Sequence, residues 1–379
     1  MSYSLSSESR YSETKCRMAH ACVMRGSNII MLGGDTESEF TWPGKHSRME
    51  LYIYNTESDK WQLLETGGCI DESIWSGGCA AAVDETLYVL CGFDSDNSER
   101  SNSVYSLDFH TMKWQHVVPT FDSEIPSRRD KFCVWTNEKR IYIFGGFGPP
   151  GKMKSKFVLL DGFSGWNNSI HVFDTESSRW SELIAQGSSP CPRAAHAGAT
   201  YGKRGYVFGG RFQNTRMNDI HYLDLETETW SGCIETVGIK PEGRSWHSLA
   251  CAGSSFLFLY GGFNTENHIL DDAWLFNIVT CEWIQVLARP PCIATRMWHT
   301  ACSSGRGEVY VFGGSSASIF GSKETLQHGR HMLIFKCDAS SLLRLCIDFI
   351  VQRPFLFHQF FPALPVGLRR QIEAQLESL

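Results

Sequence analysis

Several features that would assign this chain to a common class are missing from its sequence. No uninterrupted apolar run reaches the length of about 18 residues that a membrane-spanning helix needs, so we expect no membrane partner. Basic residues are not in excess, since the formal net charge is −6, and we therefore expect no nucleic-acid partner. The polar opening stretch MSYSLSSESRYSETK has no apolar core of a secretion signal. These absences favour a protein of the nucleus and/or the cytoplasm.

The cysteines do not form a metal-binding pattern. The sequence has 14 of them, but none forms a C-x-x-C pair and no Cys/His cluster has the spacing of zinc ligands. Most of them lie inside apolar runs, which is typical of buried, reduced thiols. We therefore expect no metal and no cofactor.

A repeated pattern is the main feature that is present. Short apolar segments end again and again in a glycine pair, or in Cys91-Gly92 in the second case, and a tryptophan follows each of the first five. The last glycines are Gly34, Gly92, Gly146, Gly210, Gly262 and Gly314. The tryptophans are Trp61, Trp114, Trp180, Trp230 and Trp283. Four repeats also open with Arg-x-x-His. Each repeat of roughly 50 residues reads as four short strands, and such a unit must stack on its neighbours to bury its faces.

Six repeats arranged radially form a closed ring, so the sequence predicts an all-β fold, a six-bladed β-propeller. The spacing of glycine pair, aromatic residue and tryptophan resembles the kelch motif, which implies the same fold. We place the propeller at 17–338, a short C-terminal α-helical segment at 339–379, and an N-terminal tail at 1–16. Because the sixth repeat lacks a closing tryptophan strand, the tail is a candidate to close the ring. The insertion at 149–163 is predicted to be a loop.

Differences between the repeats indicate candidate binding residues. Features that every repeat shares belong to the architecture, whereas a residue that differs in one repeat is a better candidate for function. Among the residues that follow the glycine pairs, only Arg211 is a cation, and Arg216 lies close to it in sequence. Two guanidiniums, a hydroxyl and aromatic walls suit a carboxylate such as a peptide C-terminus. The exceptional positions are Lys131, Trp166, Arg211, Arg216, Ser245, Trp246 and Trp298.

The residues that recur are expected to be structural. The arginines and histidines of the Arg-x-x-His openings repeat from blade to blade, so we expect the arginines to pair with carbonyls or acids of their own blade. Asp219 lies near enough to Arg216 in sequence to neutralise it internally, which leaves a structural role open for Arg216.

The C-terminal segment carries two short motifs. Leu342, Leu345, Cys346, Phe349 and Ile350 are spaced as one face of a helix. The order Ser-Leu-x-x-x-Cys-x-x-x-Ile at 341–350 resembles the elongin-binding box of cullin-RING ubiquitin ligase receptors, which implies an elongin-binding role for Leu342, Cys346 and Ile350. A second helix repeats its apolar residues from Leu364 onwards. Its opening, with Leu364, Pro365 and Leu368, resembles a cullin box of the cullin-2 type. The alternative is a helical pair that packs on the underside of the propeller.

The stretches PRAAHA, RMNDIHYL, RSWHSL and WHTAC resemble the family of kelch domain-containing proteins 1, 2 and 3, most closely 1 and 2. The resemblance implies a non-catalytic substrate receptor of a cullin-2 RING ubiquitin ligase with elongin B/C, which binds C-terminal degrons that end in glycine. It places the carboxylate-binding arginines and serine on Arg211, Arg216 and Ser245.

The resemblance also implies pocket walls at Lys131, Trp166 and Trp246. Phe147 stands where the family has a tyrosine. Asp35 replaces an aromatic residue, and this acid would disfavour an anion or select a basic residue upstream in the peptide. One alternative is a kelch scaffold or adaptor without a ubiquitin link. The other is an enzyme of the propeller-oxidase or metal-dependent kelch type, which would need His, Tyr, Cys or acidic ligands converging on the channel.

Overall fold

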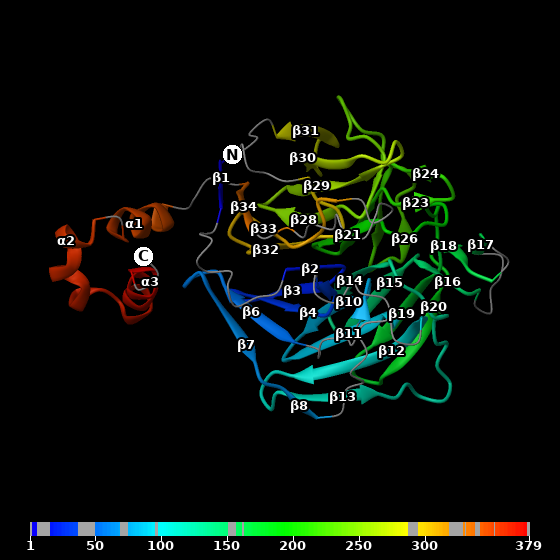
Figure 1. Cartoon of the computed structure of the whole chain (residues 1–379), viewed down its shortest axis with the longest axis horizontal. Coiled ribbons are helices and arrows are strands. Elements are labelled where there is room, and N and C mark those ends of the chain that lie inside the picture. Colours follow the sequence, from blue (N-terminus) through cyan, green and yellow to red (C-terminus); the bar gives the residue numbers. More distant parts are fainter. Residues whose placement is uncertain are drawn as a thin grey trace.

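The structure is a computed structural model. It describes residues 2–5, 16–36, 50–68, 75–94, 98–150, 157–160, 163–286, 295–317, 329, 331–337, 342–351 and 353–376. Its strands form antiparallel sheets arranged around a central axis, with a group of helices beside them (Figure 1). The chain is therefore the six-bladed propeller that the repeat predicts.

Each of the first three repeats forms one blade, whose strands run from the axis outwards in sequence order. The first blade contains β3 (Ala21–Arg25), β4 (Asn28–Leu32), β6 (Leu51–Asn55) and β7 (Lys60–Leu64). The second contains β10 (Cys79–Val83), β11 (Thr86–Asp94), β12 (Glu99–Asp108) and β13 (Lys113–Val117), with β8 (Gly67–Gly68) and β9 (Trp75–Ser76) at its edges. The third contains β14 (Cys133–Asn137), β15 (Arg140–Phe144), β19 (Ile170–Asp174) and β20 (Arg179–Leu183).

The last three blades follow the same plan, with one exchange at the end. The fourth contains β21 (Ala197–Tyr201), β22 (Arg204–Phe208), β25 (Ile220–Asp224) and β26 (Thr229–Trp230). The fifth contains β28 (Ser248–Ala252), β29 (Phe256–Asn264), β30 (Ile269–Asn277) and β31 (Glu282–Val286), with β27 (Arg244–Ser245) paired to β29. The sixth contains β32 (Thr300–Ser303), β33 (Glu308–Phe312), β34 (Leu333–Lys336) and β1 (Ser2–Leu5). Because β1 pairs antiparallel with β34, the start of the chain supplies the outer strand of the last blade.

Among the described residues, a buried hydrophobic cluster lies between each blade and the next. The repeat tryptophan of each of the first five blades belongs to the cluster shared with the preceding blade. The innermost strands contact one another all the way round, including β3 with β32, so the ring is closed. The repeat is therefore stabilised by stacking, as expected for units that cannot bury their apolar faces alone.

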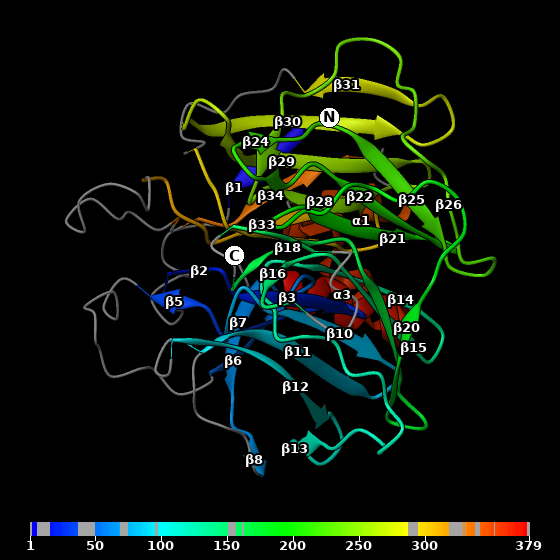
Figure 2. The same ribbon diagram turned by 90° about the vertical axis from the view of Figure 1, so that its right-hand side faces the viewer.

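Short strands at one end of the propeller carry the residues that follow the glycine pairs. They are β2 (Arg17–Met18) with β5 (Asp35–Thr36), β16 (Phe147–Gly148) with β18 (Gly165–Asn167), and β23 (Arg211–Phe212) with β24 (Thr215–Arg216). Figure 2 faces the end that carries β16 and β18.

The prediction of a loop at 149–163 is wrong for part of that insertion. Strand β17 (Phe157–Leu159) pairs antiparallel with β18, because the apolar run Phe-Val-Leu is a good strand former and finds a free edge there. Residues 151–156 and 161–162 of the insertion lie outside the described residues.

The helices form a group of their own. They are α1 (Leu342–Val351), α2 (Pro354–Phe357), the 3₁₀ helix His358–Ala363 and α3 (Val366–Leu376). Buried Ile347, Val351, Phe361 and Ile372 pack against one another as a separate cluster. Figure 1 shows this group on the left and the hairpins β16–β18 and β23–β24 on the right, with the propeller between them. No helix in the described part of the chain is long and apolar enough to cross a membrane.

Candidate functional site

A closed ring of backbone hydrogen bonds defines one mouth of the central channel. One residue in each blade takes part: the residue directly before the repeat histidine, or the equivalent position in the two blades that lack this histidine. Its backbone N–H donates to the carbonyl oxygen of the equivalent residue in the preceding blade, over 2.8–2.9 Å. These residues have positive φ values of 55–66°. They are Ala19, Gly77, Lys131, Ala195, Trp246 and Trp298. The ring therefore holds six backbone positions fixed while their side chains differ.

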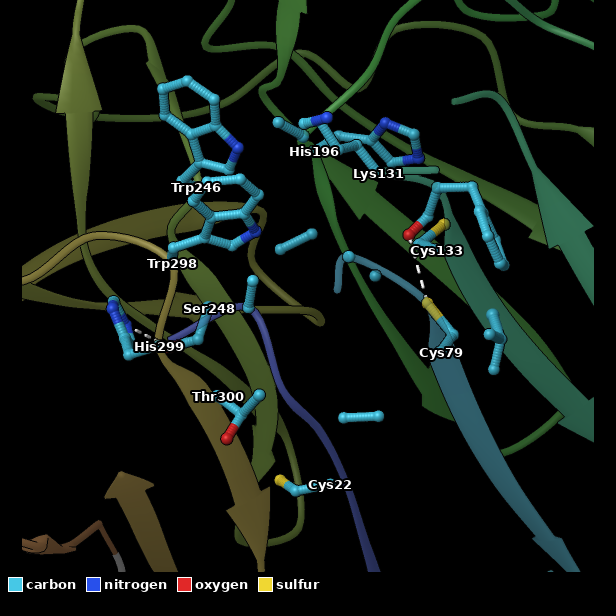
Figure 3. A pocket seen from close by; sticks show the side chains of 18 of the residues that line it. Cys22, Cys79, Lys131, Cys133, His196, Trp246, Ser248, Trp298, His299 and Thr300 are labelled. Carbon is cyan, nitrogen blue, oxygen red and sulfur yellow. Dashed lines mark hydrogen bonds between the residues drawn. The ribbon is translucent and has the colours of Figure 1, made fainter. Parts of the chain in front are cut away.

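The channel that this ring borders contains a cavity of about 260 Å³. The first residues of all six innermost strands line it, and Figure 3 shows Lys131, Trp246 and Trp298 at one end. The structure places these three candidate residues on the cavity wall. The other five candidates lie outside the lining, on the short strands of the surrounding rim.

Burial lowers the pKa of the repeat histidines His196, His247 and His299 in the channel wall. Burial, followed by the charge of a neighbouring arginine, lowers the pKa of His196 and of His299 to about 3. His299 Nε2 lies 2.9 Å from Ser248 Oγ, and His247 Nε2 lies 3.1 Å from the Phe208 carbonyl oxygen. These side chains connect neighbouring blades and carry no charge at neutral pH.

The repeat arginines are buried and engaged within their blades. Arg193 donates to the Gly209 carbonyl and to both carboxylate oxygens of Asp219, at 2.7–2.9 Å. Arg244 binds the Gly261 carbonyl and Asp272 in the same way. Although burial opposes it, hydrogen bonds from His221 and Arg193 lower the pKa of Asp219. Asp219 is therefore committed to Arg193.

Arg211 and Arg216 lie side by side on the hairpin β23–β24, where their Cα atoms are partners in the strand register. Arg216 is 8% exposed, donates its Nε–H to Ser245 Oγ over 2.9 Å, and has its guanidinium carbon 4.5 Å from the centre of the Phe263 ring. Arg211 is half-buried, and its Nε donates to the Gln213 carbonyl.

Burial and then the charge of Arg211 lower the pKa of Arg216 to about 10. Among the described residues, neither arginine forms an ion pair with a carboxylate. Two adjacent cations, one of them buried, therefore lie on the rim without a counter-charge from the described part of the chain, which is costly unless a ligand supplies one.

Aromatic rings surround the two arginines. Trp166 and Phe147 are register partners with ring centres 5.3 Å apart, and the Arg211 guanidinium carbon lies 6.0 Å from the Trp166 ring. On the other side, Trp246 and Trp298 lie 5.3 Å apart. The structure therefore places these four aromatic candidates on or beside the channel mouth.

Lys131 differs from the arginines because its charge is already neutralised. Its ammonium forms an ion pair with Asp130, which also accepts a hydrogen bond from Arg100 Nε over 2.9 Å. The Lys131 Nζ atom lies 5.6 Å from the Trp298 ring centre. Lys131 is thus a wall residue rather than a free cation.

Three side chains of the site were not selected from the sequence. Asp130 and Arg100 fix Lys131, and Phe263 supports Arg216. Phe263 follows the glycine pair of the fifth repeat, at the position that Arg211 occupies in the fourth. That shared position was the signal that could have identified it.

The predicted tail residues lie in the helical group. Cys346 is exposed on α1, and Ile350 is partly buried against the helical cluster. Leu342 begins α1, but its side chain lies outside the described residues. Pro365 is exposed between the 3₁₀ helix and α3, while Leu364 and Leu368 pack against the helical cluster.

Large apolar side chains stay exposed on the helical group. They are Phe349, Phe355, Leu356, Phe360 and Val366, and Phe355 is 98% exposed. Within the described ranges, no group of three or more His, Cys, Asp or Glu side chains is placed to hold a metal ion.

The closed ring of six blades, with its glycine pairs and repeat tryptophans, defines a kelch-repeat propeller. The model of the KLHDC2/KLHL20/DRC7 Kelch-repeats domain matches residues 19–161 and 154–314, so the chain belongs to this family. It is 37% identical over 385 residues to kelch domain-containing protein 2 of Bos taurus, covering 96% of this chain and 91% of the relative. It is 36% identical over 372 residues to kelch domain-containing protein 1 of Mus musculus, covering 94% and 89%. Kelch domain-containing protein 3 of Bos taurus is 28% identical over 355 residues, covering 87% of each chain.

Proposed function

We propose that this protein is the substrate-recognition subunit of a cullin-2 RING ubiquitin ligase and that its propeller binds the free C-terminal carboxylate of other proteins. The observation that carries the proposal is the pair Arg211 and Arg216. These guanidiniums lie together on one hairpin, and no carboxylate of the described residues pairs with either of them.

A carboxylate suits this pair for physical reasons. Guanidinium groups present parallel N–H donors that match the two oxygens of a carboxylate. Ser245 accepts from Arg216 Nε, which leaves the outer N–H groups of that guanidinium for the ligand. Burial and the charge of Arg211 lower the pKa of Arg216, and a carboxylate bound beside the guanidinium would raise it again.

The aromatic walls suit the residues just upstream of the terminus. Trp166 with Phe147, and Trp246 with Trp298, form two aromatic pairs beside the arginines. A short extended peptide that enters between them would bury apolar area on both sides, and a small last residue such as glycine would let the carboxylate reach Arg216.

The helical group supports the ligase part of the proposal. Its exposed apolar side chains are typical of a surface that a partner covers. Cys346 is exposed at the centre of the elongin-box pattern, where a small side chain allows a partner helix to approach closely. We assign elongin B/C to α1 and cullin-2, with its RING subunit, to the segment that begins at Leu364.

Peptide binding tests the proposal directly. A peptide with a free, glycine-ended carboxylate should bind the purified chain, and its C-terminal amide should bind at least about 100-fold more weakly, because the paired charge is lost. Arg216→Ala should cause a similar loss. Arg204→Ala is the matched control, because Arg204 is exposed at the opposite end of the same blade. Equal affinity for the acid and the amide would contradict the proposal.

A further inference from the structure

The first and sixth blades meet at the one place in the ring where neighbouring blades are not consecutive in the chain. There β3 packs against β32. Cys22 on β3 and Cys302 on β32 lie 280 residues apart in sequence, and their sulfur atoms are 2.9 Å apart. A disulfide bond is about 2.05 Å long, so the two sulfur atoms need to approach by less than ~1 Å to form one.

The two thiols have different surroundings. Cys22 lines the channel cavity, and Figure 3 shows its side chain there, whereas Cys302 is 7% exposed and is not among the cavity-lining residues. The hydrogen bond with Cys302 lowers the pKa of Cys22, while the same contact and burial raise the pKa of Cys302. Cys22 is thus the thiol that a small oxidant reaches through the channel, and Cys302 is placed behind it.

We propose that Cys22 and Cys302 are a redox-active pair that joins the first and sixth blades by a disulfide when hydrogen peroxide enters the channel. The Cys22 thiolate attacks one oxygen of hydrogen peroxide and the O–O bond breaks, so that Cys22 becomes a sulfenic acid. The departing hydroxide takes up the proton that the Cys22 thiol released on ionising and leaves as one water. The Cys302 sulfur then attacks the sulfenic sulfur. The S–S bond forms, the S–O bond breaks, and the departing hydroxide takes the Cys302 proton as a second water. The two cysteines lose two electrons in total, and the peroxide gains them.

The position of the pair gives this bond a specific effect. The chain runs directly from one blade to the next at the other junctions. The first and sixth blades are instead joined by packing, by the pairing of β1 with β34, and by hydrogen bonds such as that from the Ala19 N–H to the Trp298 carbonyl oxygen. A crosslink between residues so far apart restricts the unfolded chain strongly. Oxidation therefore locks the ring, and a thiol reductant releases it, which fits a reversible bond in a reducing compartment.

The full chain treated with hydrogen peroxide, then alkylated and digested without reductant, tests the inference. We expect a crosslinked peptide pair that contains Cys22 and Cys302, with the mass of two hydrogen atoms lost and with reversal by dithiothreitol. The oxidised protein should unfold about 5 °C higher than the reduced protein. Crosslinks from Cys22 to Cys79 or Cys133 instead, or stepwise oxidation of Cys22 without any crosslink, would overturn the inference.

Three variants separate the roles of the two cysteines. Cys22→Ser should abolish both the crosslink and the thermal shift. Cys302→Ala should abolish the crosslink but let the sulfenic acid of Cys22 accumulate, where dimedone traps it. Cys79→Ser, which changes another thiol of the cavity wall, is the matched control and should keep both the crosslink and the shift. Trapping at other cysteines but not at Cys22 in the Cys302→Ala protein would contradict the assigned order of attack.

Discussion

At the residue scale, the place of an arginine within the repeat decides whether its charge stabilises the fold or remains for a ligand. Arg193 and Arg244 are buried and paired with Asp219 and Asp272. Arg216 is almost as buried, but its described side-chain partners are a hydroxyl and an aromatic ring. An ion pair between Arg216 and an acid of the same chain would leave no charge for a ligand. Asp219, the acid nearest to Arg216 in sequence, pairs with Arg193 instead.

Asp35 gives a prediction at this scale. It lies on β5 in the rim, pairs in register with Met18 and accepts a hydrogen bond from Ser76 Oγ over 3.0 Å. A carboxylate at the mouth should attract a lysine or arginine upstream in a bound peptide, by about 1 kcal/mol or roughly fivefold in affinity. Asp35→Asn should remove this preference in a peptide library while the acid-over-amide preference persists. A preference for basic residues that survives the substitution would count against Asp35 as its source.

Comparison between the repeats singled out Lys131 together with the arginines, and Lys131 does line the cavity, but the pairing of its ammonium with Asp130 was not visible in the sequence. Asp130 and Lys131 are neighbours, and in a regular strand their side chains would point to opposite faces. Lys131 has a φ of 57°, so this alternation is broken and the ammonium meets the Asp130 carboxylate. A backbone conformation imposed by the hydrogen-bond ring is a property of the closed propeller and is not visible in one repeat.

At the element scale, the second glycine of each pair explains how a strand can pass close to the Arg-x-x-His segment that opens the same blade. Gly314 has a φ of 85°, and a Cβ atom there would lie 2.7 Å from both the Met297 carbonyl oxygen and the His299 Cβ atom. Positive φ and close backbone approach together exclude other residues. The repeated glycines could therefore be identified as structural from the sequence, while their contacts across the blade could not.

We expect Gly314→Ala to destabilise the propeller by about 2–4 kcal/mol, because the new methyl group collides with backbone as well as adopting a strained φ. Gly202→Ala is the control, since Gly202 also has positive φ but has open space around its Cβ position. It should cost about 1 kcal/mol. Thermal or urea unfolding monitored by tryptophan fluorescence measures both. Equal effects of the two substitutions would show that the close approach is unimportant.

The helix α1 provides a second prediction at this scale. Cys346 is exposed, so a larger, charged residue there should fit the isolated chain but block a partner helix. Cys346→Arg and Leu342→Ala should each reduce capture of elongin B/C at least tenfold in a pull-down with purified components. Cys233→Arg, at an exposed cysteine of the propeller, should leave capture unchanged. Undiminished capture by both tail variants would remove the ligase assignment and favour a scaffold without a ubiquitin link.

At the scale of the whole molecule, the two ends of the chain have different roles. The N-terminal strand β1 completes the sixth blade, whereas the C-terminal helices pack mainly on one another. The sequence predicted the number of blades, because six segments that end in a glycine pair or its equivalent could be recognised in it. The identity of the closing strand was harder to assign, since the first residues are poor strand formers and pair only because β34 offers them an unpaired edge.

Truncation separates these roles. Removing residues 1–5 should lower the unfolding midpoint of the propeller by several degrees and promote aggregation, because the edge of β34 becomes exposed. Removing residues 342–379 should leave the midpoint of the propeller within about 1 °C, because the helices have their own hydrophobic cluster. Calorimetry of the two truncated chains and of the full chain measures these unfolding midpoints. Similar losses from both deletions would mean that the helices also support the ring.

The backbone ring at the channel mouth has a consequence for how such a propeller can diversify. Its six N–H groups all donate in the same direction round the ring. These bonds involve only backbone atoms, so they form with any side chain at the position, from the hydrogen of Gly77 to the indole of Trp246. The side chains at these six positions can therefore be substituted while the backbone around them stays the same. Duplicated copies of such a gene could bind different ligands after substitution of a few of these side chains, with no change to the backbone of the propeller.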